Sequence, residues 1–418
     1  MKILILGSGQ VGSTVAQNLA AIPEHDVTVI DTDEVALKSL SSQADIQVIT
    51  GNGASPSLME MAGARDTEML LALTRSDETN LVACRIAASL FNIPNRIARV
   101  RHTDYLEFAH ENGQGISKAL GITDFISPEQ LVTEQLISLL SHTSALQVLR
   151  FADDNVRMVI VEAVEGGLLV GRPIADITNH LPEGADCQIC AVYRNNRMIV
   201  PDAQTVIIEG DEVYFLADSR HVQTIMRELR PSERQNKRIM IVGGGNIGYR
   251  LAKQVEALYD IKLIESLDSR AEWLAEHLDN TLVLLGSGAD EKLLTHEYVD
   301  EIDVFLALTN DDENNIMASL LAKDLGARRV LTIINRSRYV DLLEGNQIDI
   351  VVSPHLITIG HILASLRRGG VVAVHPLRRG SAEAVEMVVH STRLIGRRAS
   401  ERMAGRLLSV RSGTRLGG

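Results

Sequence analysis

Two glycine-rich stretches contain the residues of this chain whose types and spacing could do chemistry. Both read G-x-G-x-x-G directly after a short apolar run. In this pattern the first glycine permits a tight turn, the second lets the backbone approach a pyrophosphate, and the third lets helix and strand pack closely. The amino end of the following helix offers amides and a positive dipole end to phosphates. The candidate residues are Gly7, Ser8, Gly9, Gln10, Val11 and Gly12 in the first stretch and Gly243, Gly244, Gly245, Asn246, Ile247 and Gly248 in the second.

A carboxylate follows each stretch at the end of the next apolar run. Asp31 lies 19 residues after Gly12, and Glu265 lies 17 residues after Gly248. An acid at that place can accept hydrogen bonds from ribose hydroxyls and disfavours a 2′-phosphate. The two stretches therefore predict dinucleotide sites for NAD rather than NADP, although a similar fold that has lost its ligand would show the same pattern.

Polar residues after the fourth apolar run of each half are further candidates. They are Thr74 and Arg75 in the first half and Thr309 and Asn310 in the second. Loops at the carboxyl edge of a parallel sheet bind ligands, so these residues could reach the ribose or nicotinamide side. The acids that follow, as in Ser76-Asp77-Glu78, are typical of helix caps, and capping is the favoured interpretation for them.

Arginines end the fifth apolar run of the first half. Arg99 and Arg101 stand there, and an arginine at that edge can pair with a phosphate. An ordinary surface salt bridge explains them equally well. The second half has no basic residue aligned with Arg99, and Arg336 is the nearest cation, so the two sites could differ in ligand.

The two glycine-rich stretches belong to one unit that is written twice. KILILGSGQVGSTVAQNL, from Lys2, matches RIMIVGGGNIGYRLAKQV, from Arg238, at an offset of 236. LALTRSDETN, from Leu71, matches LALTNDDENN, from Leu306, at an offset of 235. An offset that holds between such distant stretches indicates a duplicated structural unit.

Each copy alternates short apolar runs with helical segments. In the first copy we expect strands at 2–6, 26–30, 46–49, 69–73 and 96–100 and helices at 11–21 and 77–91. This order predicts a parallel doubly wound sheet, and the second copy repeats it from Arg238 to about Ile334. Ser127-Pro128 and Ser353-Pro354 each open an apolar helix that would join one domain to the next.

The predicted fold class is α/β, with two tandem Rossmann-type sheets, each followed by a small α+β module. In the first module we expect short strands at 156–164, 187–193, 205–208 and 212–216. The second module only begins after Val371, because Arg393–Gly418 carries seven Arg and one acid instead of the expected pattern. The predicted domains are residues 1–125, 145–229, 237–355 and 371–418, the last one partial or truncated.

Composition excludes several classes of protein. Of 418 residues, 45% are hydrophobic but only 3% aromatic, which suits the aliphatic cores of parallel sheets. A net charge of −13 argues against a general nucleic-acid binder. No apolar stretch approaches the ~20 residues that span a bilayer, so any membrane association would be peripheral. The opening MKILILGSGQVG is read as a strand and turn rather than a signal peptide.

The cysteines and histidines of the sequence give little support for a metal site or a catalytic nucleophile. Cys187 and Cys190 form a C-x-x-C, but no second pair completes a four-thiolate site, and the surrounding strand-like alternation favours a structural role. His102, His110 and His142 are scattered without metal-ligand spacing and are expected at surfaces or interfaces. We predict no catalytic residue and no metal site.

The sequence resembles the TrkA family, the regulatory subunits of Trk-type potassium uptake. The likeness extends to about Arg397, and the chain departs from the family pattern after it. Besides the two LALT repeats, the matching stretches are GSGQVG at 7–12, VIDTD at 29–33, NRIARVR at 95–101, SPEQLV at 127–132, GDEVYFLA at 210–217 and RIMIVGGGNIG at 238–248.

In that family each half is an RCK unit, made of a nucleotide-binding N domain and a small C domain. The resemblance implies binding of NAD or NADH, with ATP or ADP as further ligands, and a homo-oligomer. It also implies a cytoplasmic protein, peripheral on the inner face of the plasma membrane, with a Trk-type potassium-translocating membrane subunit as partner. The family's cofactor contacts fall on Gly7 through Val11, Asp31, Thr74, Arg75 and Arg99, and on Gly243 through Ile247, Glu265, Thr309 and Asn310.

Two classes of function remain open. One is a non-enzymatic regulatory subunit that controls potassium uptake by ligand-dependent conformational change. The other is a soluble NAD-dependent oxidoreductase. A dehydrogenase needs an acid–base residue facing the nicotinamide, and the module between the sheets offers no clear one. The regulatory function is therefore favoured.

Overall fold

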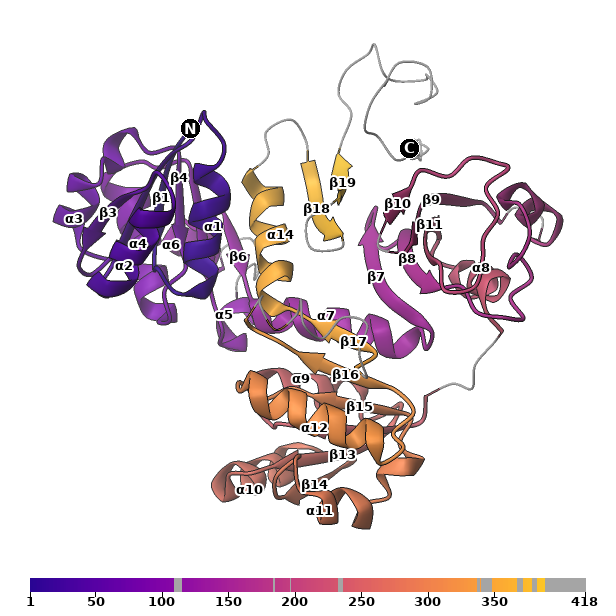
Figure 1. The fold of residues 1–418 in the computed structure, drawn as a ribbon. Coiled ribbons are helices and arrows are strands. Elements are labelled where there is room, and N and C mark those ends of the chain that lie inside the picture. Colours follow the sequence, from indigo (N-terminus) through magenta and orange to yellow (C-terminus); the bar gives the residue numbers. More distant parts are fainter. Residues whose placement is uncertain are drawn as a thin grey trace. The chain divides into compact units, whose positions relative to one another are not determined.

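The computed structural model describes residues 1–108, 115–182, 185–195, 197–231, 236–336, 339, 348–366, 371–377 and 382–387 (Figure 1). The chain divides into two compact units. Unit 1 holds Met1–Leu131, Pro354–Leu366 and Pro376–Ala382, and unit 2 holds Val132–Ser353, Arg367–His375 and Glu383–Gly418. Each unit contains one of the two glycine-rich stretches.

Unit 1 is built on a six-stranded parallel sheet with the order β3-β2-β1-β4-β5-β6. Its strands are β1 (Lys2–Leu6), β2 (Asp26–Asp31), β3 (Gln47–Thr50), β4 (Met69–Ala72), β5 (Asn95–Arg99) and β6 (Asp124–Ile126). Its helices before residue 131 are α1 (Gln10–Ala20), α2 (Glu34–Gln43), α3 (Pro56–Met61), η1 (Ala64–Asp66), α4 (Asp77–Leu90), α5 (Thr103–Glu107) and α6 (Ile116–Leu120). The strand order reverses between β1 and β4, which is where open α/β sheets bind ligands.

Alternate residues of β1 enter two apolar layers. Ile3 and Ile5 pack with α1 and α2 on one face, while Leu4 and Leu6 pack with α3 and α4 on the other. All four side chains are buried, as expected for a strand with helices on both sides. The predicted doubly wound sheet is thus confirmed.

The sequence predicts five strands in this sheet, and the structure adds a sixth. β6 has only three residues and pairs in parallel with β5. Its burial pattern has one fully buried position, Ile126, so the apolar signal in the sequence is too short to indicate a strand.

The helix α14 (Pro354–Leu366) follows the second sheet in sequence but belongs to unit 1. Ile359 and Ile362 join the apolar layer that contains α1. His355 Nε2 lies 2.8 Å from the Thr14 hydroxyl of α1. This helix therefore joins one domain to another, as its sequence predicts.

Unit 2 contains the second parallel sheet, with the order β14-β13-β12-β15-β16-β17, which repeats the first. Its strands are β12 (Arg238–Val242), β13 (Asp260–Glu265), β14 (Thr281–Leu285), β15 (Val304–Ala307), β16 (Val330–Ile333) and β17 (Ile350–Val352). Its helices are α9 (Asn246–Val255), α10 (Asp268–His277), α11 (Glu291–His296), η4 (Val299–Glu301) and α12 (Asp312–Asp324). The duplication read from the sequence is therefore a duplication of topology.

The α+β module is a five-stranded sheet with the order β10-β9-β11-β8-β7, all antiparallel. Its elements, with the preceding helix, are α7 (Pro128–Ser141), β7 (Ala145–Phe151), β8 (Val156–Glu162), η3 (Ile174–Asn179), β9 (Cys187–Arg194), β10 (Arg197–Ile199), β11 (Glu212–Asp218) and α8 (Val222–Leu229). The strand expected at 205–208 is not formed. Val206 and Ile207 make only isolated bridges, one of them to Pro173, which has no N–H to extend a ladder.

After α14 the structure describes a small two-stranded sheet, β18 (Val371–Leu377) and β19 (Ala382–Met387). These strands fall where the sequence predicts the start of a second module. The basic segment Arg393–Gly418 and His110 lie outside the described residues.

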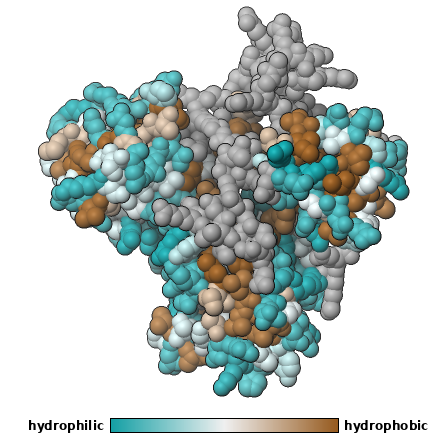
Figure 2. All heavy atoms as spheres, in the orientation of Figure 1, coloured by the Kyte–Doolittle hydropathy of each residue, from teal (hydrophilic) through white to brown (hydrophobic). Residues whose placement is uncertain are grey.

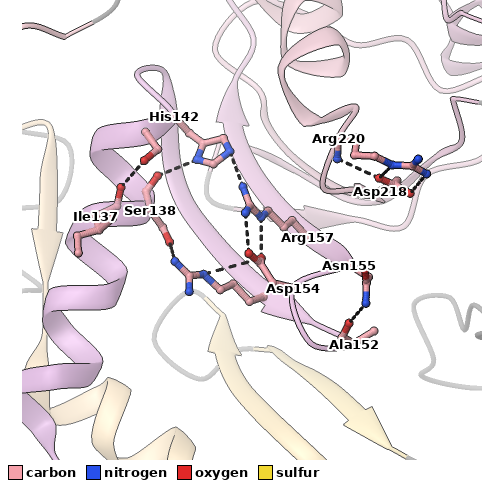
Figure 3. Close-up of polar contacts among 11 residues, drawn as sticks. Ile137, Ser138, His142, Ala152, Asp154, Asn155, Arg157, Asp218 and Arg220 are labelled. Atoms are coloured by element: carbon pink, nitrogen blue, oxygen red, sulfur yellow. Dashed lines mark hydrogen bonds and ion pairs between the residues drawn. The ribbon is translucent and has the colours of Figure 1, made fainter. Parts of the chain in front are cut away.

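His142 lies just after α7 and is buried, not at the surface (Figure 3). Its Nε2 is 3.0 Å from Arg157 Nη1, and its Nδ1 is 2.8 Å from the Ser138 carbonyl. Because a guanidinium only donates, Nε2 must accept, and Nδ1 carries the proton donated to Ser138. Burial lowers the pKa of His142, the positive charges of Arg157 and Arg150 lower it further, and Asp154 opposes them. The structure therefore holds this imidazole neutral.

We expect the free energy of unfolding of unit 2 to fall as the pH drops below about 6.5, the ordinary pKa of histidine. The unfolded imidazole takes up a proton in that range, whereas the folded one, with its lowered pKa, does not. His142→Gln should flatten this pH dependence and cost about 1 kcal/mol at pH values above the transition. Urea denaturation at several pH values measures both effects. His296→Gln, at an exposed position of the same unit, is the control, and an unflattened profile in His142→Gln would contradict the assignment.

Candidate functional site

Two glycines of the first turn are required by the protein's own packing. Gly7, directly after β1, has φ +105°, a backbone conformation that favours glycine. A Cβ on Gly12 would lie 2.0 Å from the Gly7 carbonyl oxygen, because the first turn of α1 passes directly over the turn. In the second copy Gly243 has φ +100°, and a Cβ on Gly248 would lie 1.9 Å from the Gly243 oxygen.

The middle glycine of each turn is different. A Cβ on Gly9 or on Gly245 would meet no protein atom within 4 Å. Both residues have extended backbone that any amino acid can adopt, with φ −63° and −65°, and both are exposed. The protein itself therefore does not require glycine here. The open position is the one that a pyrophosphate would approach.

Gly9 and Gly245 are also the N-cap residues of α1 and α9, and no side chain caps either helix. Gln10 and Asn246, at the first helical positions, are exposed, and Val11 and Ile247 are half-buried. The positive end of each helix dipole thus faces an open position at the carboxyl edge of a parallel sheet.

The carboxylate at the end of the second strand is bonded to the glycine-rich turn in both copies. Asp31 accepts hydrogen bonds from the amides of Ser8 and Asp33, and the latter bond is 2.9 Å long. Burial alone would raise the pKa of Asp31, but these hydrogen bonds hold the pKa below its ordinary value. The half-buried Asp31 is therefore ionised at neutral pH and positioned beside the turn.

Glu265 is more deeply engaged than Asp31 and is 8% exposed. Its Oε2 accepts from the Gly244 amide at 2.8 Å, and its Oε1 accepts from the amides of Ser266 and Leu267 at 2.8 and 3.0 Å. The carboxylate thus fastens the turn and the start of α10. Its place beside the turn matches the expectation from the sequence.

The threonines predicted to contact a ligand are held by a buried asparagine in each copy. Asn80 of α4 accepts from the Thr74 amide and hydroxyl at 3.0 and 2.7 Å and donates to the carbonyls of Thr74 and Arg99. Asn315 of α12 makes the same four bonds, to Thr309 and to the Ile333 carbonyl. Arg75 and Asn310, next to the threonines, are exposed. Both asparagines end the repeated LALT stretches, and that repetition is the only signal in the sequence for their role.

The predicted capping is confirmed for the first residue of each motif. Ser76 caps α4 by accepting from the Thr79 amide, and Asp311 caps α12 by accepting from the Asn314 amide. The buried Asp77 instead accepts from the amides of Arg101 and His102, and Asp312 likewise binds the amides of residues 335 and 336. Each tethers the loop after the next strand, a contact between residues too far apart for a local pattern to reveal.

Arg99 and Arg101 both face Glu129, in the first turn of α7. Arg99 Nη2 and Arg101 Nε each lie 3.9 Å from Glu129 Oε1. The side chain of Arg99 is only 14% exposed, and burial lowers its pKa. In the second copy Arg336 pairs with Glu313 at 2.5 Å. The structure thus contains the salt bridge that was one of the two explanations for Arg99. It lies at the sheet edge where a phosphate contact was also expected.

The described residues contain no group of three or more His, Cys, Asp or Glu side chains that could hold a metal ion. Cys187 and Cys190 both lie on β9. Cys187 packs against the core of the module, to which Cys190 does not belong. No disulfide joins any of the three cysteines, all of which the structure describes.

The TrkA-N domain family matches residues 3–128 and 239–354, and the TrkA-C domain family matches residues 158–230. The Trk system potassium uptake protein TrkA of Halomonas elongata is 46% identical over all of this chain and 90% of its own length. Its namesake from Vibrio alginolyticus is 45% identical over 95% of this chain and 87% of its own. This chain belongs to the TrkA family.

Solved structures with the TrkA-type fold are more distant in sequence. The GsuK channel bound to NAD matches with a TM-score of 0.65 and 20% identity, over 87% of this chain and 63% of that one. The GsuK structure bound to ADP matches with a TM-score of 0.55 and 16% identity, over 87% of this chain and 68% of that one. These likenesses show that the TrkA-family chain shares the fold of RCK-type channel domains.

Because Asn80 and Asn315 are fully buried and each joins two loops, we expect their removal to destabilise the fold. Asn80→Ala and Asn315→Ala should each lower the free energy of unfolding by about 2 kcal/mol or more, since backbone groups are left unpaired. Chemical denaturation measures the loss. Asn18→Ala, which removes an exposed side chain on α1, is the matched control and should change little. Equal effects from all three variants would contradict the structural role.

Proposed function

We propose that this chain is a nucleotide-binding regulatory subunit of potassium uptake that acts on a Trk-type membrane subunit through ligand-dependent conformational change. The observation that carries nucleotide binding is the open position above Gly9 and Gly245. A glycine that the fold does not need, on a helix dipole and beside an acid, is explained by a ligand that approaches the backbone.

The proposed ligand of the first site is NAD or NADH, with ATP or ADP as further ligands. The ionised Asp31 beside the turn supports a ribose with free hydroxyls. The candidate contacts are Gly7 through Gly12, Asp31, Thr74, Arg75 and Arg99, and their counterparts in the second copy. In the two GsuK structures, a protein of the same fold binds NAD and ADP.

The proposed partner is a Trk-type potassium-translocating subunit, with the chain located in the cytoplasm at the inner face of the membrane. The names of the TrkA relatives support this assignment. Within the described residues we find no helix with the length and apolar character that crossing a membrane requires.

We also propose that the chain assembles as a homo-oligomer. Figure 2 shows apolar residues gathered on the face of the α+β module turned to the viewer. Exposed apolar residues of this module include Met198 on β10, an outer strand of the sheet, and Val200 just after it. A second copy could cover such residues, as apolar surface of this kind often marks an interface.

The proposed nucleotide site at each turn can be blocked separately by a single substitution. Gly9→Glu and Gly245→Glu each add a carboxylate at an exposed position where the Cβ meets no described atom within 4 Å, so the fold should be kept. The added charge should repel the pyrophosphate and weaken NADH binding at the altered turn about tenfold or more, which corresponds to about 1.4 kcal/mol. Calorimetric titration with NADH measures this. Asn18→Glu, which adds the same charge at an exposed position of α1 away from the turn, is the control, and unchanged affinity in both Glu variants at the turns would contradict nucleotide binding there.

The regulatory function is tested in bacteria that lack their own Trk regulatory subunit. Expression of this chain should restore potassium uptake at low external potassium, and the double variant Gly9→Glu, Gly245→Glu should not. The purified chain should bind NADH without oxidising it, which separates a regulator from the alternative, an NAD-dependent oxidoreductase. Consumption of NADH with a small carbonyl substrate, together with no restored uptake, would contradict the proposal.

A further inference from the structure

The two turns differ in what stands over them, although their backbones agree. In the second copy Arg270 of α10 donates from Nε to the Gly244 carbonyl at 2.9 Å. The corresponding residue of α2, counted from the start of each helix, is Ala36. The second turn thus carries a cation that the first one lacks.

Aromatic side chains hold this guanidinium in place. The Arg270 Cζ lies 4.1 Å from the centre of the Trp273 ring and 5.9 Å from that of Tyr249. Trp273 in turn stacks on His277, with ring centres 4.0 Å apart. The corresponding residues of the first copy are small or polar, namely Ser13 for Tyr249, Ser39 for Trp273 and Gln43 for His277.

The approach of α10 to the turn explains Gly244, which replaces Ser8 of the first copy. A Cβ on Gly244 would lie 2.1 Å from Leu274 Cδ1 and 3.1 Å from Glu265 Oε2. Glycine therefore lets α10 come close enough for Arg270 to reach the turn. The arrangement is built into the local packing and is not a chance position of a surface side chain.

Arg270 is not neutralised by a carboxylate. The only hydrogen bond of its guanidinium within the described part of the chain uses Nε, and no ion pair there involves it. Both terminal nitrogens remain as donors, and a guanidinium presents them in a fork that matches a phosphate. The planar group is already ordered by Trp273, so binding costs little further side-chain entropy.

Backbone amides occupy both oxygens of the acid in each copy. Three backbone amides already occupy the two oxygens of Glu265. In the first copy Asp31 is less buried, and Asp33 and Glu34 follow it with no cation in the place of Arg270. Acids also follow Glu265 in the second copy, namely Asp268 and Glu272, so the two ribose sides differ in the guanidinium of Arg270 and not in the number of acids.

We propose that the second site accepts an adenine nucleotide with a phosphate on its ribose, such as NADP(H), and that Arg270 binds that phosphate. Gly244 and Glu265, which flank Arg270, occupy the places that border the adenosine ribose in a G-x-G-x-x-G site. The first site takes the dinucleotide without this phosphate. The two halves of the chain then respond to different nucleotides. This inference rests on the nucleotide binding proposed above for the second turn.

The test uses the full chain with one turn closed at a time. With Gly9→Glu, which leaves the second site, NADPH should bind at least as tightly as NADH. With Gly245→Glu, which leaves the first site, NADPH should bind about tenfold or more weakly than NADH, because a 2′-phosphate would meet Asp31 with no arginine at the place of Arg270 to offset the repulsion. A second ligand pair, 2′,5′-ADP and 5′-ADP, has the same two phosphates and differs only in the place of one.

Arg270→Gln in the Gly9→Glu chain should weaken NADPH about tenfold or more and leave NADH nearly unchanged, and Arg270→Lys should weaken NADPH less. The control is Arg238→Gln, which removes an exposed arginine at the other end of β12, paired with Glu301. Equal loss of NADH and NADPH in Arg270→Gln would overturn the proposal, because it would indicate stacking on adenine instead. If the Gly9→Glu chain binds NADH and NADPH equally and Arg270→Gln changes neither affinity, the role of Arg270 is overturned, whereas nucleotide binding at the second turn is kept. Binding of neither would overturn both.

Discussion

The close passage of a helix over a glycine-rich turn is the constraint on which both halves of this chain depend. A single added carbon on Gly12 or Gly248 would fall about two ångströms from the carbonyl oxygen of the first glycine of its turn. Only without a side chain can the first turn of the helix sit there. The helix end then faces the carboxyl edge of the sheet, and the position above Gly9 or Gly245 stays open.

The loops around this edge are tied together by polar side chains, of which all but the half-buried Asp31 are buried. Asp31 holds the turn to the second strand, Asn80 holds the ends of β4 and β5, and Asp77 holds the loop after β5. Asn315 and Asp312 repeat these ties in the second copy. Buried polar groups with satisfied hydrogen bonds rigidify a structure. A ligand that contacts the turn and the β4 loop would thus act on connected segments, as a regulatory site requires.

Duplication preserved this scaffold and changed what surrounds it. The strand order, the glycine conformations and the asparagine ties agree between the halves. The residues beside the turn differ, with Ala36 in one copy and Arg270 stacked on Trp273 in the other. A chain with two equivalent scaffolds and two different charge environments can respond to two ligands, and the crossing of α14 into unit 1 links the halves through one continuous chain.

The sequence by itself determined the local features. Glycine spacing indicated both turns, apolar runs indicated the buried strands, and the fixed offset indicated the duplication, because each depends on neighbours along the chain. Only the tertiary structure decided that β6 joins the sheet, that Asp77 tethers a distant loop, and that Arg270 reaches the Gly244 carbonyl. These features depend on contacts between residues far apart in sequence, and no local periodicity records which of them the packing of helices on a sheet brings together.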